Sequence, residues 1–432
     1  MQAIVYRYQS IFPRLPYPVR VALNFVMMLF IVPTTIVRMV RDHFKYPDPV
    51  LAISEAQLDA QLSLEVVDDA LDPLAALEEH AHMLSREGRW ADLTKLMASF
   101  DRRRATFGAS RLTAVTALGA RGDHLQEMTE FEDCAAMQIS DIDDAELLRL
   151  ETAFAGRKDD PYLAGILARA HLDMAWALRG GDFADAVTDA GWDGYAKHIS
   201  RAEKIMEPFD ALTLDSAFVA ATKHLIAPNL EDAERALKDT YDTYSTLDPL
   251  NWDIMGQYAF HLLPRWYGDY AQIEVAARKA IAASETEAGT AAYAAFYMGI
   301  LHRDEHAIHM VDPELFEQAL RDMIDYSDRD PIEINRILDY CLGAFAHSFG
   351  AFPREGEDEI NDIRMQMRDI PNRLIRDYFD AHLPQVWSLE TRHVRQAVGL
   401  AYNEELETGA QITLTREGPR IEMPQEPQPQ TE

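Results

Sequence analysis

Asp-Pro pairs recur at nearly equal intervals and divide this chain into helical units. An aspartate that precedes a helix accepts hydrogen bonds from the unpaired amides of the first turn, and proline suits the first helical position because its missing amide has no partner there. Successive pairs are 88, 88 and 82 residues apart, and further helix starts near Pro208 and Gly289 divide two of these intervals. The pattern predicts helix pairs of about 40 to 48 residues each. The four pairs that follow this spacing are Asp72-Pro73, Asp160-Pro161, Asp248-Pro249 and Asp330-Pro331.

Three segments with the order glycine, polar residue, aromatic residue fall between the members of predicted helix pairs. Glycine allows a helix to end in a left-handed turn, and the aromatic side chain can pack between the two helices just after that turn. Apolar residues then resume at helical spacing. We therefore predict structural roles at Gly88 and Trp90, Gly181 and Phe183, and Gly268 and Tyr270.

These segments resemble the tetratricopeptide-like family of helical repeats. The resemblance rests on residues 178–186, on residues 266–270 followed by 277–280, and on residues 233–237. Its units are longer than the family repeat, which marks a divergent member. The resemblance implies a right-handed solenoid whose concave surface holds peptides or protein segments. We predict an all-α chain with a helical-repeat domain over residues 73–407.

An uncharged apolar run, Val21 to Val37, lies between Arg20 and Arg38. As a helix it would be roughly 25 Å long, slightly less than the ~30 Å hydrocarbon layer of a bilayer, and the flanking arginines can extend toward the headgroups. Residues 1–45 are therefore predicted to form a basic leader and a membrane anchor helix. The anchor residues are Val21, Phe25, Met28, Phe30, Val32 and Ile36.

Three interpretations of this run remain open. It can be an uncleaved single span, a segment that enters one leaflet, or a helix buried in the fold or in a partner. A cleaved signal peptide fits poorly, because the run is too long and lacks a small-residue cleavage site. The expected location is a membrane, the inner membrane if the source is bacterial, with the cytoplasm as the alternative.

The charge is divided unequally along the chain. The total is −31, yet residues 1–45 carry +5, so the remainder carries −36. A basic segment beside an apolar helix is attracted to anionic lipid, whereas an acidic body disfavours nucleic acid as a partner. The expected partners are a membrane and one or more proteins.

One short motif has a possible catalytic meaning. His302, Glu305 and His306 form the H-x-x-E-H pattern of inverted zinc peptidases, in which two histidines on one helix hold the metal and the glutamate acts as a base. The motif falls where the repeat pattern predicts a turn, so we interpret it as a polar connection between helices. A metal-dependent hydrolase is kept as an alternative.

The two ends of the body have different compositions. Residues 46–72 are expected to form a connector with a short helix. Residues 408–432 are rich in Pro, Gln and Glu and are expected to form a disordered tail.

Altogether the sequence favours a membrane-tethered scaffold that binds protein partners without catalysis and without a cofactor. A soluble cytosolic adaptor whose first helix is buried in a partner is the other alternative.

Overall fold

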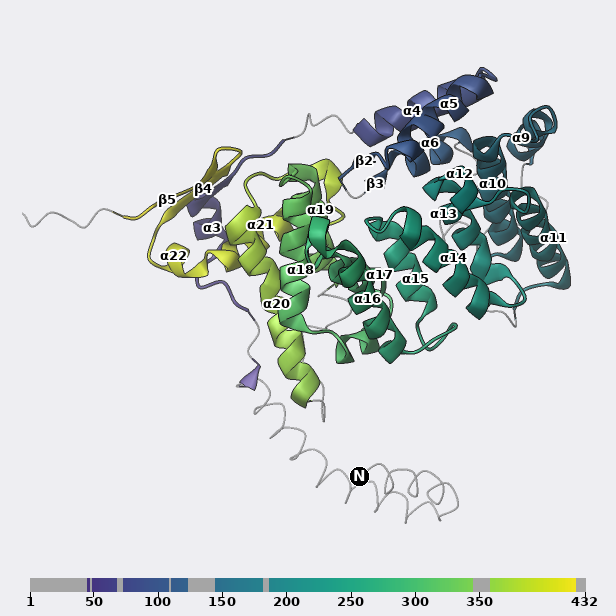
Figure 1. The fold of residues 1–432 in the computed structure, drawn as a ribbon. Helices are drawn as coiled ribbons and strands as arrows, with labels where there is room; N and C mark the ends of the chain where they lie inside the picture. Colours follow the sequence, from purple (N-terminus) through teal and green to yellow (C-terminus); the bar gives the residue numbers. More distant parts are fainter. Residues whose placement is uncertain are drawn as a thin grey trace, which may run out of the picture.

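The computed structural model describes residues 45–46, 49–67, 73–108, 110–122, 144–181, 186–344 and 358–424, and most of them are helical (Figure 1). The first helices are α3 (Glu55–Gln61), α4 (Pro73–Arg86), α5 (Trp90–Arg102), α6 (Leu112–Ala120), α9 (Ala145–Ala155), α10 (Pro161–Arg179), α11 (Asp189–Met206), α12 (Ala211–Leu214), α13 (Ala217–Ile226), the 3-10 helix η3 (Ala227–Asn229) and α14 (Ala233–Leu247). They are followed by α15 (Trp252–His261), α16 (Tyr270–Ala288), α17 (Ala291–Leu301), η4 (Glu305–His309), α18 (Pro313–Tyr326), α19 (Pro331–Ala344), α20 (Asp358–Tyr378), η6 (Pro384–Val386), α21 (Thr391–Ala401) and α22 (Asn403–Glu407). The strands are β1 (Leu62–Leu64), β2 (Thr106–Phe107), β3 (Ser110–Arg111), β4 (Gln411–Thr415) and β5 (Gly418–Glu422).

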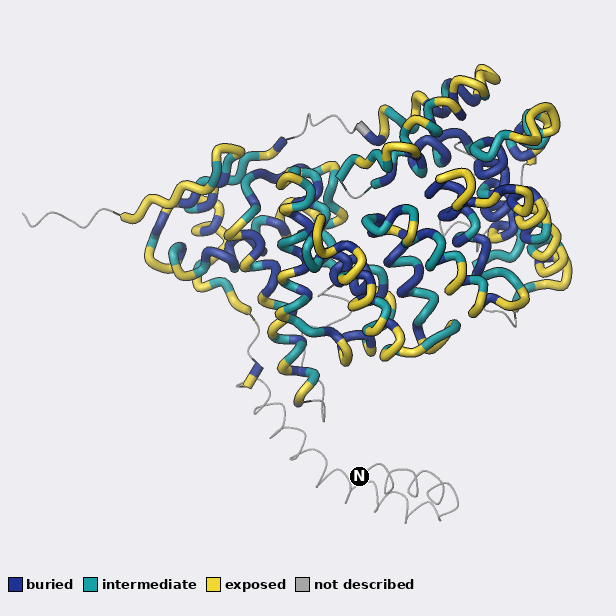
Figure 2. The backbone as a smooth tube through the Cα atoms, viewed as in Figure 1, coloured by how far each residue is buried: buried dark blue, intermediate teal, exposed yellow. Residues whose placement is uncertain are grey.

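Helices that are close in the sequence pack side by side. Helix α10 lies against α11 and α13, α15 lies against α17, and α17 also contacts α16 and α18. Their inward faces join in one hydrophobic cluster that extends from Leu58 to Leu414, and Figure 2 shows buried stretches alternating with exposed ones along the helices. The described part of the chain is thus predominantly α-helical, as predicted.

The predicted helix starts are confirmed at Asp160-Pro161 and Asp330-Pro331. The Asp160 carboxylate accepts hydrogen bonds from two amides of α10, and α19 begins at Pro331. Helix α4 begins at Pro73, whereas Asp72 lies outside the described residues. The start at Asp248-Pro249 is wrong: α15 begins at Trp252, where the Asn251 side chain accepts the amide of Ile254.

The three predicted turns use their glycines differently. Gly88, between α4 and α5, is left-handed with a φ of 69°, as predicted, and Trp90 starts α5. The left-handed residue that ends α10 is Gly180 rather than Gly181, and Phe183 lies outside the described residues.

At the third turn, glycine is required because there is no room for a side chain, not because the backbone is left-handed. Gly268 has no positive φ, but a Cβ atom there would lie 2.7 Å from the carbonyl oxygen of Leu262. Only glycine fits that approach, and Asp269 then caps α16, which Tyr270 begins.

The tail prediction is wrong for residues 411–422. Strand β4 pairs parallel with β1 and antiparallel with β5, so the C-terminal segment folds back onto the connector. Ile412 and Leu414 are fully buried there, and the burial of these apolar side chains offsets the conformational entropy that the strand loses on folding. Residues 425–432 lie outside the described chain.

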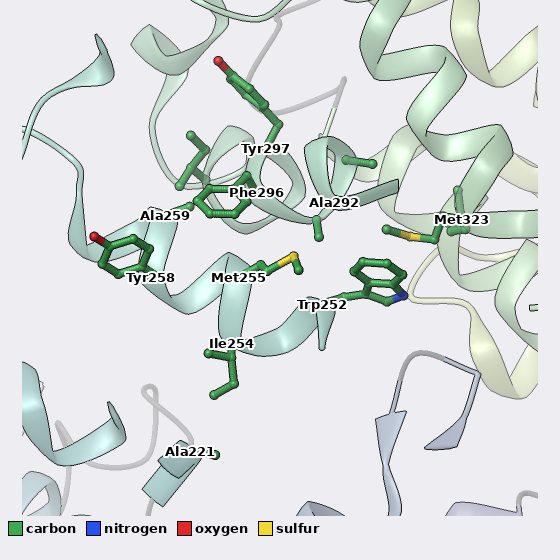
Figure 3. Packing of buried hydrophobic residues seen from close by; sticks show 14 of the residues in the cluster. Ala221, Trp252, Ile254, Met255, Tyr258, Ala259, Ala292, Phe296, Tyr297 and Met323 are labelled. Atoms are coloured by element: carbon green, nitrogen blue, oxygen red, sulfur yellow. The ribbon is translucent and has the colours of Figure 1, made fainter. Parts of the chain in front are cut away.

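The centre of the body is a close crossing of α15 and α17 (Figure 3). Gly256 on α15 faces Gly299 on α17, and a Cβ at position 299 would lie 2.4 Å from the Gly256 Cα. Trp252 and Tyr258 flank this crossing and are both buried, as their helical spacing predicts. Because both residues are glycines, the backbones of α15 and α17 come into direct contact.

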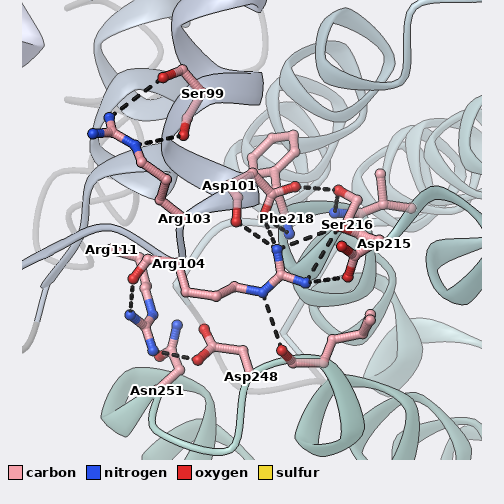
Figure 4. Close-up of polar contacts among 12 residues, drawn as sticks. Ser99, Asp101, Arg103, Arg104, Arg111, Asp215, Ser216, Phe218, Asp248 and Asn251 are labelled. Atoms are coloured by element: carbon pink, nitrogen blue, oxygen red, sulfur yellow. Dashed lines mark hydrogen bonds and ion pairs between the residues drawn. The ribbon is translucent and has the colours of Figure 1, made fainter.

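A segment between α5 and α6, described over residues 104–108 and 110–111, crosses the connections of later helices and is called the strap here (Figure 4). Arg104 pairs with Asp215 at 2.7 Å and donates from Nε to the carbonyl of Leu247 at 3.1 Å. Arg111 forms a buried ion pair with Asp248. Gly108 comes so near α19 that a Cβ there would lie 2.9 Å from Glu333 Oε2. The strap thus joins parts of the chain that do not follow one another.

A largely buried histidine pair links α9, α10 and α11. The Nδ1 atoms of His171 and His198 are 2.8 Å apart, so one ring must donate a proton that the other accepts. His171 Nε2 lies 3.0 Å from Glu151, which also binds Arg201. Burial lowers the pKa of both histidines, and for His198, beside His171, the pKa falls to about 4.

Acidification should therefore destabilise the fold. The His198 pKa lies below its ordinary value of 6.5, so the unfolded chain takes up the proton first, and the stabilisation present above pH 6.5 is lost as the pH falls to about 4. Urea unfolding at pH 7 and pH 5 should show a smaller pH effect in His198→Asn than in the native chain. The exposed His80→Asn serves as control; equal pH effects in both variants would contradict this assignment.

Candidate functional site

An apolar groove lies between α14 and α16, with the end of α15 as its floor. Its volume is about 500 Å³ and its walls are two nearly continuous helix flanks. Alanines at four positions along the α16 wall leave room for the backbone of an incoming segment. The lining residues are Glu234, Leu237, Lys238, Tyr241, Asp242, Ser245, Tyr258, Leu262, Tyr267, Asp269, Ala271, Gln272, Val275, Ala276, Lys279, Ala280 and Ala283.

A stacked tyrosine pair forms the floor. The rings of Tyr241 and Tyr258 are parallel within 10° with centroids 4.0 Å apart, and both meet the edge of Phe296 beneath them. Each side chain is more than nine-tenths buried, yet neither hydroxyl has a hydrogen-bond partner within the described residues. Figure 3 shows the Tyr258 hydroxyl pointing away from the packed cluster. Burial raises the pKa of both phenols, so they stay protonated and can donate to a ligand.

Charged side chains cross the mouth of the groove. Asp242 on α14 accepts from Lys238 at 2.7 Å and from Lys279 of α16 at 3.0 Å. Burial would raise the pKa of Asp242, but the two lysine hydrogen bonds lower it overall. Val275, exposed by 69%, stands on the opposite rim. The groove therefore combines an apolar floor with a polar and partly apolar rim.

The dimensions suit a helix. The α14 wall from Glu234 to Ser245 is about 16 Å long at 1.5 Å per residue, which is three helical turns. Grooves of this kind receive the apolar face of an amphipathic helix through side chains at positions i, i+3, i+4 and i+7. The lining contains no histidine or cysteine, and its charged side chains include the Asp242 pairs with Lys238 and Lys279.

The H-x-x-E-H motif lies away from this groove and is divided between two elements. Helix α17 ends at Leu301, His302 follows it, and Glu305 and His306 belong to η4. His302 uses Nδ1 toward the carbonyl of Met298 at 3.0 Å and accepts at Nε2 from Arg303 at 2.9 Å. The motif thus lies in the connection between α17 and α18, and the described residues contain no group of His, Cys, Asp or Glu that could hold a metal.

The predicted membrane anchor, including Val21 and Ile36, lies outside the described residues. Among the helices that are described, none combines the length and apolar character needed to cross a bilayer.

The sequence patterns named neither the groove nor its floor as a site. Of the predicted turns, the one at Gly268 to Tyr270 adjoins it, since Asp269 lines one end. The sequence signal that could have indicated the groove is the series of alanines on α16 around the exposed Val275. Comparison of the chain with protein-family models, with curated proteins and with solved structures gave no match. The groove must therefore be interpreted from its own chemistry.

Proposed function

We propose that this chain is a membrane-tethered helical-repeat scaffold of tetratricopeptide-like type that binds an amphipathic helix of a partner protein, without catalysis of its own. The α14–α16 groove is the observation that supports the proposal most directly. Its length, alanine-lined wall and tyrosine floor match a helix of about three turns. The apolar run from Val21 to Val37 supplies the tether.

Helix packing by sequence neighbours supports the repeat part of this proposal. Helices α15 to α18 contact mainly the next helix or the one after it, as stacked helix pairs do. Such stacks leave surface furrows between helices of adjacent pairs, and the α14–α16 groove is one of these. In this arrangement the partner helix extends the stack laterally.

Val275→Glu should abolish most partner binding without unfolding the scaffold. Val275 is mainly exposed, so its replacement should change the free energy of unfolding by less than about 0.5 kcal/mol. A charge on the groove rim should weaken binding at least about tenfold, because the partner's apolar face would have to desolvate it. Tagged full-length protein purified from native membranes should lose one co-purifying protein.

Leu148→Glu is the matched control, since Leu148 is also an exposed apolar residue, 57% accessible, but lies on α9 far from the groove lining. It should keep the co-purifying protein. If both variants retain the same proteins, the groove does not bind a partner.

A further inference from the structure

A continuous row of aromatic and arginine side chains, here called the tryptophan edge, lies along the connections between helices. It begins at the junction of α10 and α11. The ring of Tyr195 meets Trp176 at 5.4 Å and Trp192 at 5.7 Å, both edge-on. The Arg179 guanidinium lies over both indoles, at 5.4 and 5.3 Å.

The row continues through η3 to the turn between α15 and α16. The Tyr195 hydroxyl donates to Asn229 Oδ1 at 2.6 Å, and the Tyr267 hydroxyl donates to the carbonyl of Pro228 at 2.7 Å. The Tyr267 ring lies 6.3 Å from that of Trp266. Two residues of η3 thus join the two aromatic groups.

Its other end reaches the connection after α17. Trp266 packs 5.7 Å from Phe260, and the guanidinium groups of Arg265 and Arg303 lie over the Phe260 ring at 5.3 and 4.8 Å. Arg265 also donates to the backbone carbonyl of Arg303 at 3.4 Å. The α10–α11 junction, η3, the α15–α16 turn and the connection after α17 therefore share one row of rings and cations.

The three tryptophans of this edge are unusually open to solvent. Trp176, Trp192 and Trp266 are exposed by 36, 36 and 44%, whereas Trp252 in the core is exposed by 6%. Burying an aromatic ring is strongly favourable, so an exposed row of tryptophans marks a surface that is covered in use.

The chain enters the described body on the same side. Lys45 and Tyr46 bind Asp362 near the start of α20, through contacts of 3.6 and 3.0 Å, and α20 packs against η4. The α15–α16 turn and this end of α20 both lie on the lower side of Figure 1.

The connector to the apolar run is short. Seven residues lie between Val37 and Lys45, so even a fully extended chain keeps Lys45 within about 28 Å of the end of that run. If the run is the tether proposed above, the side of the body near Lys45 must stay close to the bilayer surface.

We propose that the tryptophan edge lies against the phospholipid headgroup layer, so that this edge is the surface by which the body of the tethered scaffold contacts the membrane. Indole rings favour the headgroup region, and guanidinium groups donate in pairs to phosphate oxygens. The nearby carboxylates of Asp269 and Asp304 are occupied as helix caps. This inference rests on the proposed tether, and the edge adjoins the α14–α16 groove at Tyr267.

Quenching of tryptophan fluorescence by brominated phosphatidylcholine tests the contact. Full-length protein is bound to vesicles of that lipid, and its emission is compared with that in unbrominated vesicles. Residues 1–45 contain no tryptophan, so the tether itself gives no signal. The native chain should be quenched, and the triple variant Trp176→Phe, Trp192→Phe and Trp266→Phe, which keeps three tryptophans elsewhere, should lose at least half of the quenching.

A second variant keeps all six tryptophans and replaces three cations, as Arg179→Gln, Arg265→Gln and Arg303→Gln; it should reduce quenching as well. Flotation with the vesicles is measured in parallel. Flotation with equal quenching in the native chain and the triple variant, or with no quenching, would overturn the edge contact alone. Failure of the full-length chain to float would overturn the tether too and favour a cytosolic adaptor.

Discussion

Replacing Arg111 with alanine is expected to destabilise the fold by about 3–5 kcal/mol, because it leaves the Asp248 carboxylate buried without its cation. Asp248 is 3% exposed, and its other hydrogen bond comes from the Tyr244 hydroxyl at 2.8 Å. Arg111 also donates to the carbonyl of Arg104 at 2.5 Å, so the same change loosens the strap. Urea unfolding of the full-length chain, followed by circular dichroism, measures the loss.

Arg103→Ala is the control for this prediction. Arg103 lies one position before the strap and contacts only Ser99 of its own helix by hydrogen bond, as Figure 4 shows. Its loss should cost less than about 0.5 kcal/mol. The double variant Arg111→Met, Asp248→Leu should be more stable than Arg111→Ala, since no unpaired charge remains buried. Similar stability of Arg111→Ala and Arg103→Ala would show that the strap does not hold the helices together.

Gly299→Ala should be among the most damaging single-methyl changes in the described part of the body. The added Cβ would lie 2.4 Å from the Gly256 Cα and 2.5 Å from its carbonyl oxygen, and backbone atoms cannot move aside as side chains do. Overpacking of this kind costs about 1–3 kcal/mol or more, which exceeds the gain of about 1 kcal/mol that alanine brings to a helix. The melting temperature should fall accordingly.

Gly343→Ala makes the same chemical change on α19, where no atom of the described residues lies within 4 Å of the added Cβ. This variant should be as stable as the native chain or slightly more stable. Because α15 carries Tyr258, Gly299→Ala should also weaken partner binding in the groove. A stable Gly299→Ala protein with full binding would mean that α15 and α17 are not in close contact.

Local signals in the sequence were sufficient for the helical class. Asp160 and Asp330 cap helices through atoms within three residues of themselves, so a short segment contains all the information. Asp248 has the same neighbour, Pro249, but its carboxylate binds Arg111, which is 137 residues away. No local pattern distinguishes a capping aspartate from one that forms a distant ion pair.

The strands and the groove depend on contacts between remote segments. Ile412 and Leu414 alternate with threonine or glutamine in the period of two that strands show, but their partner β1 lies about 350 residues earlier, and the surrounding prolines suggested disorder. Tyr258 is a buried residue that packs against Phe296. Its second role, as the groove floor, arises only because α14 places Tyr241 parallel to it.

Photo-crosslinking from position 275 in native membranes is the most direct test of the central claim, that the α14–α16 groove holds a helix of a partner protein. A benzophenone side chain at Val275 should capture one protein, and the crosslinked peptide should show apolar residues at positions i, i+3, i+4 and i+7. The same probe at Leu148 should not capture it. Crosslinks that are identical from both positions, or an absence of crosslinks from position 275, would contradict the account.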